Sequence, residues 1–408
     1  MNFAVTPKMV GRVFSFGALI AMALALAITL LIPRDALARH RRAPARAHTG
    51  ATQTPALTES YVAACTMEPT TGTIIFEKDI HRQWPMASVT KMMLMLIVAQ
   101  KLDDGSLKLT DMVTTSAKAS KIGGSQVYLK EGERFSIDDM MKAIVVHSAN
   151  DSSVAVAEHV AGSTDAFVEM MNHQATALGL KDTHYYSVHG LPPAPGQQAD
   201  VSSAYDLCQL SRALMKYPQI LKWSSIDTAP FRNGLFELRN TNHLVRTYPG
   251  CDGLKTGFYD KAGFNVVATA HRSGLRLISV VLGSPNKNEN FKSAATLLSQ
   301  GFLSYQMRTV AKAGTPVDQT VAVKDGAVDS VKLVWARDVS VFVKRDEAKR
   351  AFKLDYKLPP SVAAPVTAGQ TIGMGMVSTG SDAPQEVPLV AAQDVPRGTL
   401  VQRLMGRL

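Results

Sequence analysis

The stretch Pro85-Met86-Ala87-Ser88-Val89-Thr90-Lys91 leads directly into the apolar run Met92-Met93-Leu94-Met95-Leu96-Ile97-Val98-Ala99. This run is too short to span a bilayer and too apolar for an exposed helix, so it predicts a helix buried in a core. Gly105 predicts the end of that helix. Because residues three apart share one face of a helix, we expect Ser88 and Lys91 to lie together at its first turn.

A serine hydroxyl beside a half-buried lysine amine is typical of an activated nucleophile. Burial disfavours the ammonium form and lowers the lysine pKa, so the neutral amine can accept the serine proton. Ser-x-x-Lys has only two fixed positions, however, and a second copy occurs at Ser284-Pro285-Asn286-Lys287. The motif alone fits an ordinary buried helix as well as a catalytic site.

Two further motifs follow in a fixed order. Ser148-Ala149-Asn150 separates two apolar helical patterns, a position that also suits a plain interhelical turn. Lys255-Thr256-Gly257 lies in a predicted strand, where lysine and threonine can donate to an anion and glycine lets a ligand approach the backbone. Each motif is weak alone, but their order and context favour one site. The Ser284 copy comes after Lys255 and does not fit that order.

The pattern of elements predicts the fold class. A hairpin within 61–77 precedes helices that begin near Ser88, Ser136, Ser152, Thr164 and Ser203, the last ending at Pro218. Asn233-Gly234 predicts a hairpin, 254–283 an antiparallel meander, and 290–305 a helix that packs on it. We therefore expect an α/β domain over 59–306, with an antiparallel sheet covered by helices. Short alternating strands predict a small all-β domain over 309–395.

Here the chain resembles the penicillin-recognising serine enzymes, whose signature is this trio of motifs. Within that superfamily it is most similar to the D-alanyl-D-alanine carboxypeptidases, the low-molecular-mass penicillin-binding proteins. The supporting stretches are 85–91, 148–151, 177–184, 188–191 and 252–258. The resemblance implies a β-lactamase/transpeptidase-like domain, a peptidoglycan stem-peptide substrate, inhibition by β-lactams and no cofactor.

The resemblance also implies a role for each matching residue. Ser88 would be the nucleophile that opens the D-Ala-D-Ala bond, Lys91 its general base, and Ser148 a proton relay to the leaving D-alanine. The substrate-binding residues would be Asn150 for the acyl side chain's amide, Lys255 and Thr256 for the terminal carboxylate, and Gly257 and Phe258 on the same strand. The N–H groups of Ser88 and Phe258 would form the oxyanion hole, at about 3 kcal/mol per donor.

Several alternatives stay open. An endopeptidase that cuts cross-links would use the same chemistry on another acceptor. A β-lactamase would need a glutamate to activate the deacylating water, and Glu158 and Glu169 lack the expected loop context. A non-catalytic wall-binding scaffold is disfavoured by the intact trio. A Ser-His-Asp hydrolase is unexpected without Gly-x-Ser-x-Gly.

The termini predict export to the bacterial periplasm or the outer face of the cytoplasmic membrane. Residues 1–38 have the basic start, apolar stretch and Ala36-Leu37-Ala38 site of a secretory signal, with an uncleaved membrane anchor as the alternative. Residues 39–58 form a basic linker predicted to be disordered, and 396–408 a short amphipathic tail that either anchors to a membrane or packs on the β-domain.

The remaining composition excludes some classes of function. The formal net charge is +10, but Arg39, Arg41, Arg42 and Arg46 crowd into the linker, so no nucleic-acid partner is expected. No His-Glu-x-x-His occurs, so no metal is expected. The three cysteines, Cys65, Cys208 and Cys251, have no metal-ligand spacing. They are expected mainly as buried small residues, with one disulfide as the alternative.

Overall fold

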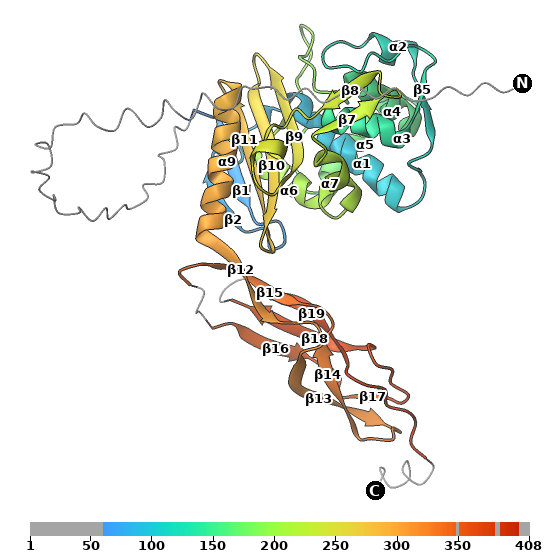
Figure 1. Cartoon of the computed structure of the whole chain (residues 1–408), viewed down its shortest axis with the longest axis vertical. Helices are drawn as coiled ribbons and strands as arrows, with labels where there is room; N and C mark the ends of the chain where they lie inside the picture. Colours follow the sequence, from blue (N-terminus) through green and yellow to red (C-terminus); the bar gives the residue numbers. More distant parts are fainter. Residues whose placement is uncertain (1–59, 348–350, 380–383, 400–408) are drawn as a thin grey trace, which may run out of the picture. The chain divides into compact units, whose positions relative to one another are not determined.

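The computed structural model describes residues 60–347, 351–379 and 384–399 (Figure 1). The predicted signal peptide at 1–38 and linker at 39–58 lie outside these ranges, as do residues 400–408 of the predicted tail. Within the described ranges, no helix has the length and apolar content needed to cross a membrane.

A five-stranded sheet forms the centre of the first domain, in the order β2-β1-β11-β10-β9. Its strands are β1 (Ala63–Met67), β2 (Ile74–Lys78), β9 (Cys251–Tyr259), β10 (Gly263–Arg272) and β11 (Leu275–Ser284). Every neighbouring pair is antiparallel, which confirms the predicted hairpin and meander. Because β9 is last in the order, its outer edge has no strand partner among the described residues.

Helices cover both faces of this sheet (Figure 1). On one face α9 (Lys287–Ser304) packs through Phe291, Leu297 and Leu298, as its apolar spacing predicts. On the other face lies a larger helical layer around α1 (Lys91–Asp103), whose residues from Met92 to Ala99 are all buried. The other helices are α2 (Ala117–Lys121), α3 (Ile137–Val146), α4 (Asn150–Ala161), α5 (Thr164–Ala177), α6 (Ala204–Leu214), α7 (Pro218–Ser224) and α8 (Leu244–Thr247).

Three helix boundaries differ from the predictions. Helix α4 begins at Asn150 rather than near Ser152, so Asn150 lies inside the helix. Pro218 does not end a helix but starts α7, because proline at the first helical position has no N–H that needs a partner. Helix α9 begins earlier than Asn290, because the Asn286 side chain accepts a hydrogen bond from the Glu289 N–H at 2.8 Å and caps it. Ser284 ends β11 and Lys287 begins α9, so the second Ser-x-x-Lys does not share one helix face.

Three two-stranded sheets flank the helical layer. They are β3 (Trp84–Pro85) with β6 (Val201–Ser202), β4 (Met112–Thr114) with β5 (Arg134–Ser136), and β7 (Thr228–Phe231) with β8 (Phe236–Arg239). The last pair is the hairpin that Asn233-Gly234 predicts, and both residues have positive φ, as such turns require.

The second domain is all β, as predicted, with a valine-rich core of its own. A six-stranded sheet has the order β16-β18-β19-β14-β13-β17, and β12 (Tyr305–Ala311) pairs with β15 (Val339–Lys344). The remaining strands are β13 (Pro316–Lys324), β14 (Ser330–Trp335), β16 (Lys353–Lys357), β17 (Ser361–Ala363), β18 (Thr371–Ser378) and β19 (Gln385–Ala391). Strands β12, β17 and β19 were not predicted.

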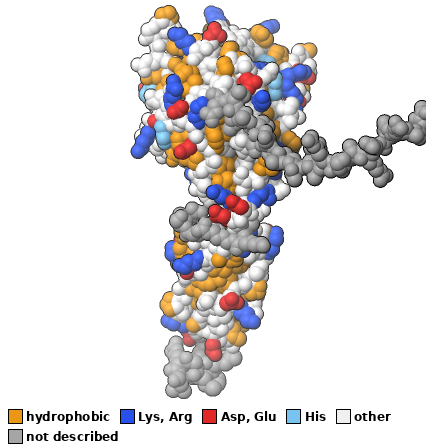
Figure 2. Space-filling view, turned by 90° about the vertical axis from the view of Figure 1, so that its left-hand side faces the viewer, with side chains coloured by type: hydrophobic (Ala, Val, Ile, Leu, Met, Phe, Trp, Pro, Cys, Tyr) orange, Lys and Arg blue, Asp and Glu red, His pale blue; other side chains and the backbone are white. Residues whose placement is uncertain are grey.

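The surface and the cysteines bear on two predictions. On the face shown in Figure 2, lysine and arginine side chains are interspersed with acidic ones rather than gathered into one stripe. Cys65, Cys208 and Cys251 are all buried and free of disulfides. The buried-residue interpretation is therefore confirmed over the disulfide alternative.

Candidate active site

Ser88 and Lys91 lie together at the start of α1, as their spacing predicts. A short 3₁₀ turn, Ala87–Thr90, runs directly into α1, whose first residue is Lys91. The Lys91 Nζ donates to Ser88 Oγ at 2.9 Å and to the backbone carbonyl of His189 at 2.6 Å. The Lys91 side chain is completely buried. A buried amine within hydrogen-bonding distance of a hydroxyl can act as its base.

The surroundings of Lys91 favour its neutral form. Burial has the largest effect and lowers the Lys91 pKa well below its ordinary value, and the nearby charge of Lys255 lowers it further. Asp200 and Asp151 oppose this shift with smaller effects. Burial and the charge of Lys255 therefore both favour the neutral amine, whose lone pair can accept a proton from Ser88.

Ser148 and Lys255 form a second hydroxyl–amine pair. Lys255 lies on β9 and donates from Nζ to Ser148 Oγ at 2.8 Å and to the Thr256 carbonyl at 2.9 Å. Burial lowers the pKa of Lys255 to about 7. Near neutral pH this amine can therefore exist in either protonation state, and its protonated form would bind an anion.

The rest of the Lys-Thr-Gly motif places β9 against Ser88. Thr256 Oγ1 donates to Thr241 Oγ1 at 2.7 Å. Gly257 lies so close to the Ser88 turn that a Cβ there would stand 2.8 Å from the Ser88 nitrogen. Phe258 follows; the residue is 53% exposed, and its ring stacks on that of Phe264 with the ring centroids 4.1 Å apart. The backbone of the edge strand thus passes beside the Ser88 N–H, as an oxyanion hole shared by Ser88 and Phe258 requires.

Asn150 lies at the first position of α4, with Ser148 just before it. Its Nδ2 donates to the Gly123 carbonyl at 2.7 Å, and its backbone N–H donates to the Ser125 carbonyl at 2.7 Å. Among the described residues, Oδ1 of this buried side chain has no hydrogen-bond partner. Oδ1 is therefore an unused acceptor, buried beside the loop that contains Gly123 and Ser125.

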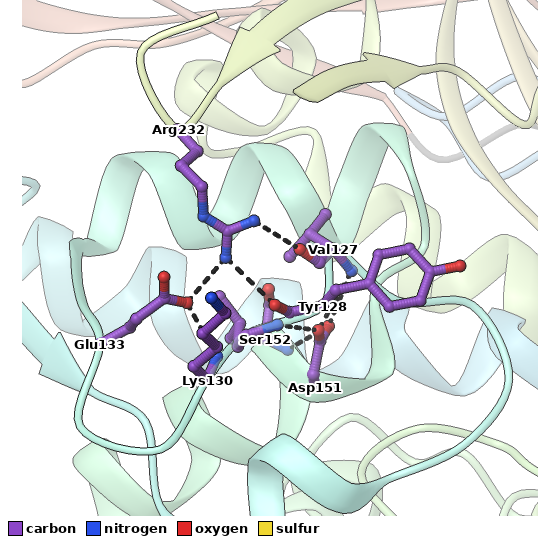
Figure 3. Close-up of polar contacts among 8 residues, drawn as sticks. Val127, Tyr128, Lys130, Glu133, Asp151, Ser152 and Arg232 are labelled. Carbon is purple, nitrogen blue, oxygen red and sulfur yellow. Dashed lines mark hydrogen bonds and ion pairs between the residues drawn. The ribbon is translucent and has the colours of Figure 1, made fainter. Parts of the chain in front are cut away.

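The loop that contacts Asn150 through Gly123 and Ser125 is held by two side chains, Asp151 and Arg232 (Figure 3). The buried Asp151 carboxylate accepts from the N–H groups of Val127 and Leu129 at 3.1 and 3.0 Å. Arg232, from the turn between β7 and β8, donates to the Val127 carbonyl at 3.2 Å and to Glu133 at 2.7 Å. Charge-assisted hydrogen bonds of this kind hold the loop against α4.

Non-glycine residues with positive φ occur at two points of the site. Ala87, just before Ser88, has φ 50°, and Ser148 has φ 67°. Such conformations cost on the order of 1–3 kcal/mol each and cluster at active sites, where they aim a side chain. Gly190 also has positive φ, and a Cβ there would stand 2.0 Å from the Ala87 carbonyl. Only glycine fits that contact.

All eight predicted site residues thus belong to one arrangement around Ser88. Sequence reasoning missed the His189 carbonyl, the Gly123 carbonyl and Thr241, which hold Lys91, Asn150 and Thr256 respectively. Two of the three partners are backbone atoms, which leave no mark in the sequence. Within the described part of the chain, no group of His, Cys, Asp and Glu could hold a metal ion.

Comparison with known families agrees with this geometry. The D-alanyl-D-alanine carboxypeptidase family, peptidase S11, matches residues 49–286. The chain belongs to the D-alanyl-D-alanine carboxypeptidase family. The C-terminal domain of penicillin-binding protein 5 matches residues 305–397, which identifies the β-domain as well. The protein is therefore a serine-type D-Ala-D-Ala carboxypeptidase with the two-domain fold that its sequence predicts.

Individual relatives match over most of their length. The chain is 32% identical to the D-alanyl-D-alanine carboxypeptidase DacF of Bacillus subtilis, over 87% of this chain and 91% of that protein. It is 34% identical to DacD of Escherichia coli, over 83% and 87%. A D-alanyl-D-alanine endopeptidase of Pseudomonas aeruginosa is 32% identical over 58% of this chain and 75% of that protein.

Solved structures show the same fold. Penicillin-binding protein 5 of Haemophilus influenzae aligns with a TM-score of 0.64 and 30% identity, covering 83% of this chain and 98% of that one. Penicillin-binding protein D2 of Listeria monocytogenes, solved in its ampicillin-bound form, aligns with a TM-score of 0.56 and 30% identity. It covers 61% of this chain and 100% of that one.

The two glutamates considered for a β-lactamase lie on helices α4 and α5. Glu158 is near the C-terminal end of α4, eight residues beyond Asn150, which places it about 12 Å along the helix axis. Glu169 lies on α5, where it lines a surface cavity with Lys101 and His173. Neither carboxylate forms a hydrogen bond with Ser88 or Lys91 in the described residues.

Proposed function

We propose that Ser88 attacks the carbonyl carbon between the two terminal D-alanines of a peptidoglycan stem pentapeptide. Lys91 accepts the Ser88 proton, the C–N bond breaks, and the leaving amine of D-alanine takes a proton relayed through Ser148. Water then hydrolyses the Ser88 ester and restores the free enzyme. The observation that carries this proposal is the 2.9 Å hydrogen bond from a fully buried Lys91 amine to Ser88 Oγ.

The substrate-binding roles follow from chemistry at the same site. We assign the terminal carboxylate to Lys255 and Thr256, because an ammonium and a hydroxyl beside an open strand edge suit an anion. Asn150 binds an amide of the acyl-side peptide. The N–H groups of Ser88 and Phe258 bind the developing oxyanion, and each such donor contributes about 3 kcal/mol. Gly257 is required so that these groups can approach one another.

We also propose that β-lactams acylate Ser88 and that the adduct persists. The positions of Glu158 and Glu169 support slow deacylation, because a rapid β-lactamase needs a base beside the hydrolytic water. Ampicillin and cefotaxime are bound in structures of penicillin-binding protein D2 of Listeria monocytogenes, a related fold.

A labelled penicillin followed by gel and mass spectrometry tests these roles. Wild type should carry a persistent label on the peptide that contains Ser88, and Ser88→Ala should carry none. Ser284→Ala is the matched control, because it removes the serine of the other Ser-x-x-Lys and should leave labelling unchanged. A label that vanishes as ring-opened penicillin accumulates would mean a β-lactamase. No label on folded wild type would contradict the catalytic assignment.

Release of D-alanine from the pentapeptide, compared with cleavage of a cross-linked dimer, separates carboxypeptidase from endopeptidase preference. The cross-linked dimer is included because one relative of the chain is a D-alanyl-D-alanine endopeptidase. We expect the pentapeptide to be the better substrate.

The domain boundaries and location are also proposals. We propose that residues 1–38 are a secretory signal, 39–58 a linker, 59–306 the catalytic domain and 309–395 the β-domain. The exported enzyme would act in the periplasm or at the outer face of the cytoplasmic membrane, with membrane association through the N-terminal segment or the tail at 396–408. Mass spectrometry of the mature N-terminus and fractionation with and without the tail test these proposals.

A further inference from the structure

We propose that Asp200 is a positioning residue for Lys91: its buried carboxylate fixes the Ser187–Gly190 turn so that the His189 carbonyl accepts a hydrogen bond from the lysine amine. This inference rests on the proposed role of Lys91 as general base. It concerns a residue distant in sequence from each of the three motifs, and no side chain of the turn itself contacts Ser88 or Lys91 through a hydrogen bond in the described structure.

The Asp200 carboxylate connects two separate segments. Its Oδ1 accepts from the N–H groups of Tyr186 and Ser187 at 2.6 and 2.9 Å. Its Oδ2 accepts from Ser187 Oγ at 2.6 Å and from Thr90 Oγ1 at 3.1 Å. Thr90 directly precedes Lys91, so one carboxylate holds both the start of α1 and the turn that faces it. Asp200 is only 5% exposed, and burial raises its pKa.

Ser187 links the Asp200 carboxylate to the backbone of the turn. Its Oγ accepts from the N–H groups of Gly190 and His189 at 2.8 and 3.3 Å while it donates to Asp200. A hydroxyl has one proton and two lone pairs, so these three bonds use all of its capacity. Because a carboxylate can only accept, Asp200 forces the Ser187 proton toward itself and leaves both lone pairs for the turn.

The fixed turn then presents the His189 carbonyl to the catalytic groups. The carbonyl lies 2.6 Å from Lys91 Nζ and 3.5 Å from Ser88 Oγ. The turn cannot move inward, because Gly190 already contacts the Ala87 carbonyl. The His189 ring accepts the Leu191 N–H at Nδ1, and burial together with Lys91 lowers its pKa to about 4, so it adds no charge at neutral pH. The orientation of the carbonyl thus depends on Ser187 and Asp200.

Asp206 is a second buried aspartate whose carboxylate accepts hydrogen bonds from a nearby turn, as that of Asp200 does. Asp206 is 2% exposed and accepts from the Asp182 N–H at 2.7 Å and from Thr183 Oγ1 at 2.8 Å. Burial raises its pKa as it does for Asp200. Asp206 has no hydrogen bond to the turn that faces Lys91, so Asp206→Asn is a matched control for loss of a buried carboxylate.

The test is the second-order rate constant for acylation of Ser88 by a labelled penicillin, measured as a function of pH. Asp200→Asn keeps the shape but turns an N–H₂ group toward Ser187 Oγ, which has no lone pair left. We expect acylation at the plateau to fall about tenfold or more, a loss typical of a misplaced catalytic group. Asp206→Asn should lower the melting temperature but keep the wild-type plateau.

The pH profile distinguishes positioning from general destabilisation. The charged groups that face Lys91 are Lys255 on β9, Asp151 on α4 and Asp200 itself. Because the Asp200 carboxylate raises the Lys91 pKa, its loss should move the acidic limb of the profile to lower pH. Asp206→Asn should not move that limb.

A second pair of variants keeps the proposal testable if Asp200→Asn does not fold. Ser187→Ala should lower acylation, and Ser187→Thr, which keeps the hydroxyl, should restore most of it. A wild-type plateau and limb in Asp200→Asn, or equal losses in Asp200→Asn and Asp206→Asn, would overturn the inference. Acylation of Ser187→Ala at the wild-type rate would also overturn the inference. Absence of acylation in wild type would instead refute the proposed function.

Discussion

The contact between Gly257 and the Ser88 turn gives the sharpest single test of the site. An alanine Cβ at position 257 would stand 2.5 Å from the Met86 carbonyl oxygen, 2.8 Å from the Ser88 nitrogen and 2.9 Å from the Val89 nitrogen. All three are backbone atoms, so no side chain can rotate away. Gly257→Ala must therefore push β9 away from the nucleophile.

The displacement can be estimated from these distances. The shortest contact is about 1 Å below the optimal separation of non-bonded atoms, so β9 and the turn must separate by that amount. A misplacement of about 1 Å costs on the order of a hundredfold in rate, which corresponds to roughly 2.7 kcal/mol of transition-state stabilisation. The loss should appear in acylation, because the displaced strand carries the Phe258 N–H and the Lys255 amine.

Stopped-flow acylation by a fluorescent penicillin measures the effect, and thermal unfolding measures folding. Gly301→Ala is the control, because its Cβ would meet side-chain methyl groups of Leu277 and Ile75 at 2.6 and 2.7 Å, in the core under α9. It should lower the melting temperature but leave acylation near the wild-type rate. Acylation of Gly257→Ala within threefold of wild type would refute the proposed packing of β9 on the Ser88 turn.

Three further predictions concern stability and reactivity. Burial lowers the pKa of Lys255 from 10.5 to about 7. Between these two pH values the folded protein therefore binds fewer protons than the unfolded chain. The free energy of unfolding should rise with pH in this window and fall as the pH drops toward 7. Urea unfolding across that window should show this slope, on the order of 1.4 kcal/mol per pH unit from Lys255 alone, and Lys255→Met should reduce it. Asp151→Asn should cost about 1–3 kcal/mol by urea unfolding, since it weakens hydrogen bonds to the buried N–H groups of Val127 and Leu129; a neutral result would contradict the role of Asp151 in holding the loop. The three buried cysteines should react with a thiol reagent only after unfolding, and rapid labelling of the native protein would contradict their burial.

The sequence predicted those parts of the fold that depend on side-chain pattern. The run after Ser88 is apolar on every side, and it forms a helix that is buried along most of its length. The strands of the meander alternate with turn residues, and they pair in that order. Pro218 was misjudged because proline both ends helices and begins them, and the pattern alone does not separate the two positions.

The parts of the site that were missed depend on backbone atoms and long-range contacts. The His189 carbonyl that holds Lys91 is a backbone atom, and the His189 ring instead accepts a hydrogen bond from the Leu191 N–H, so residue type gives no signal. Ala87 and Ser148 have positive φ without being glycine or asparagine, so no turn signature marks them. Asp200 contacts Thr90 across 110 positions of the chain, a pairing that only the fold creates.

The two buried lysines suit the two roles proposed for them, a base at Lys91 and an anion-binding cation at Lys255. Each is completely buried at its amine, so desolvation lowers both pKa values. The charge of Lys255 lowers the Lys91 pKa further, while burial lowers the Lys255 pKa to about 7. A substrate carboxylate at Lys255 would favour protonation of that amine. The resulting ammonium would in turn keep Lys91 neutral, so binding of the terminal carboxylate would itself prepare the base that activates Ser88.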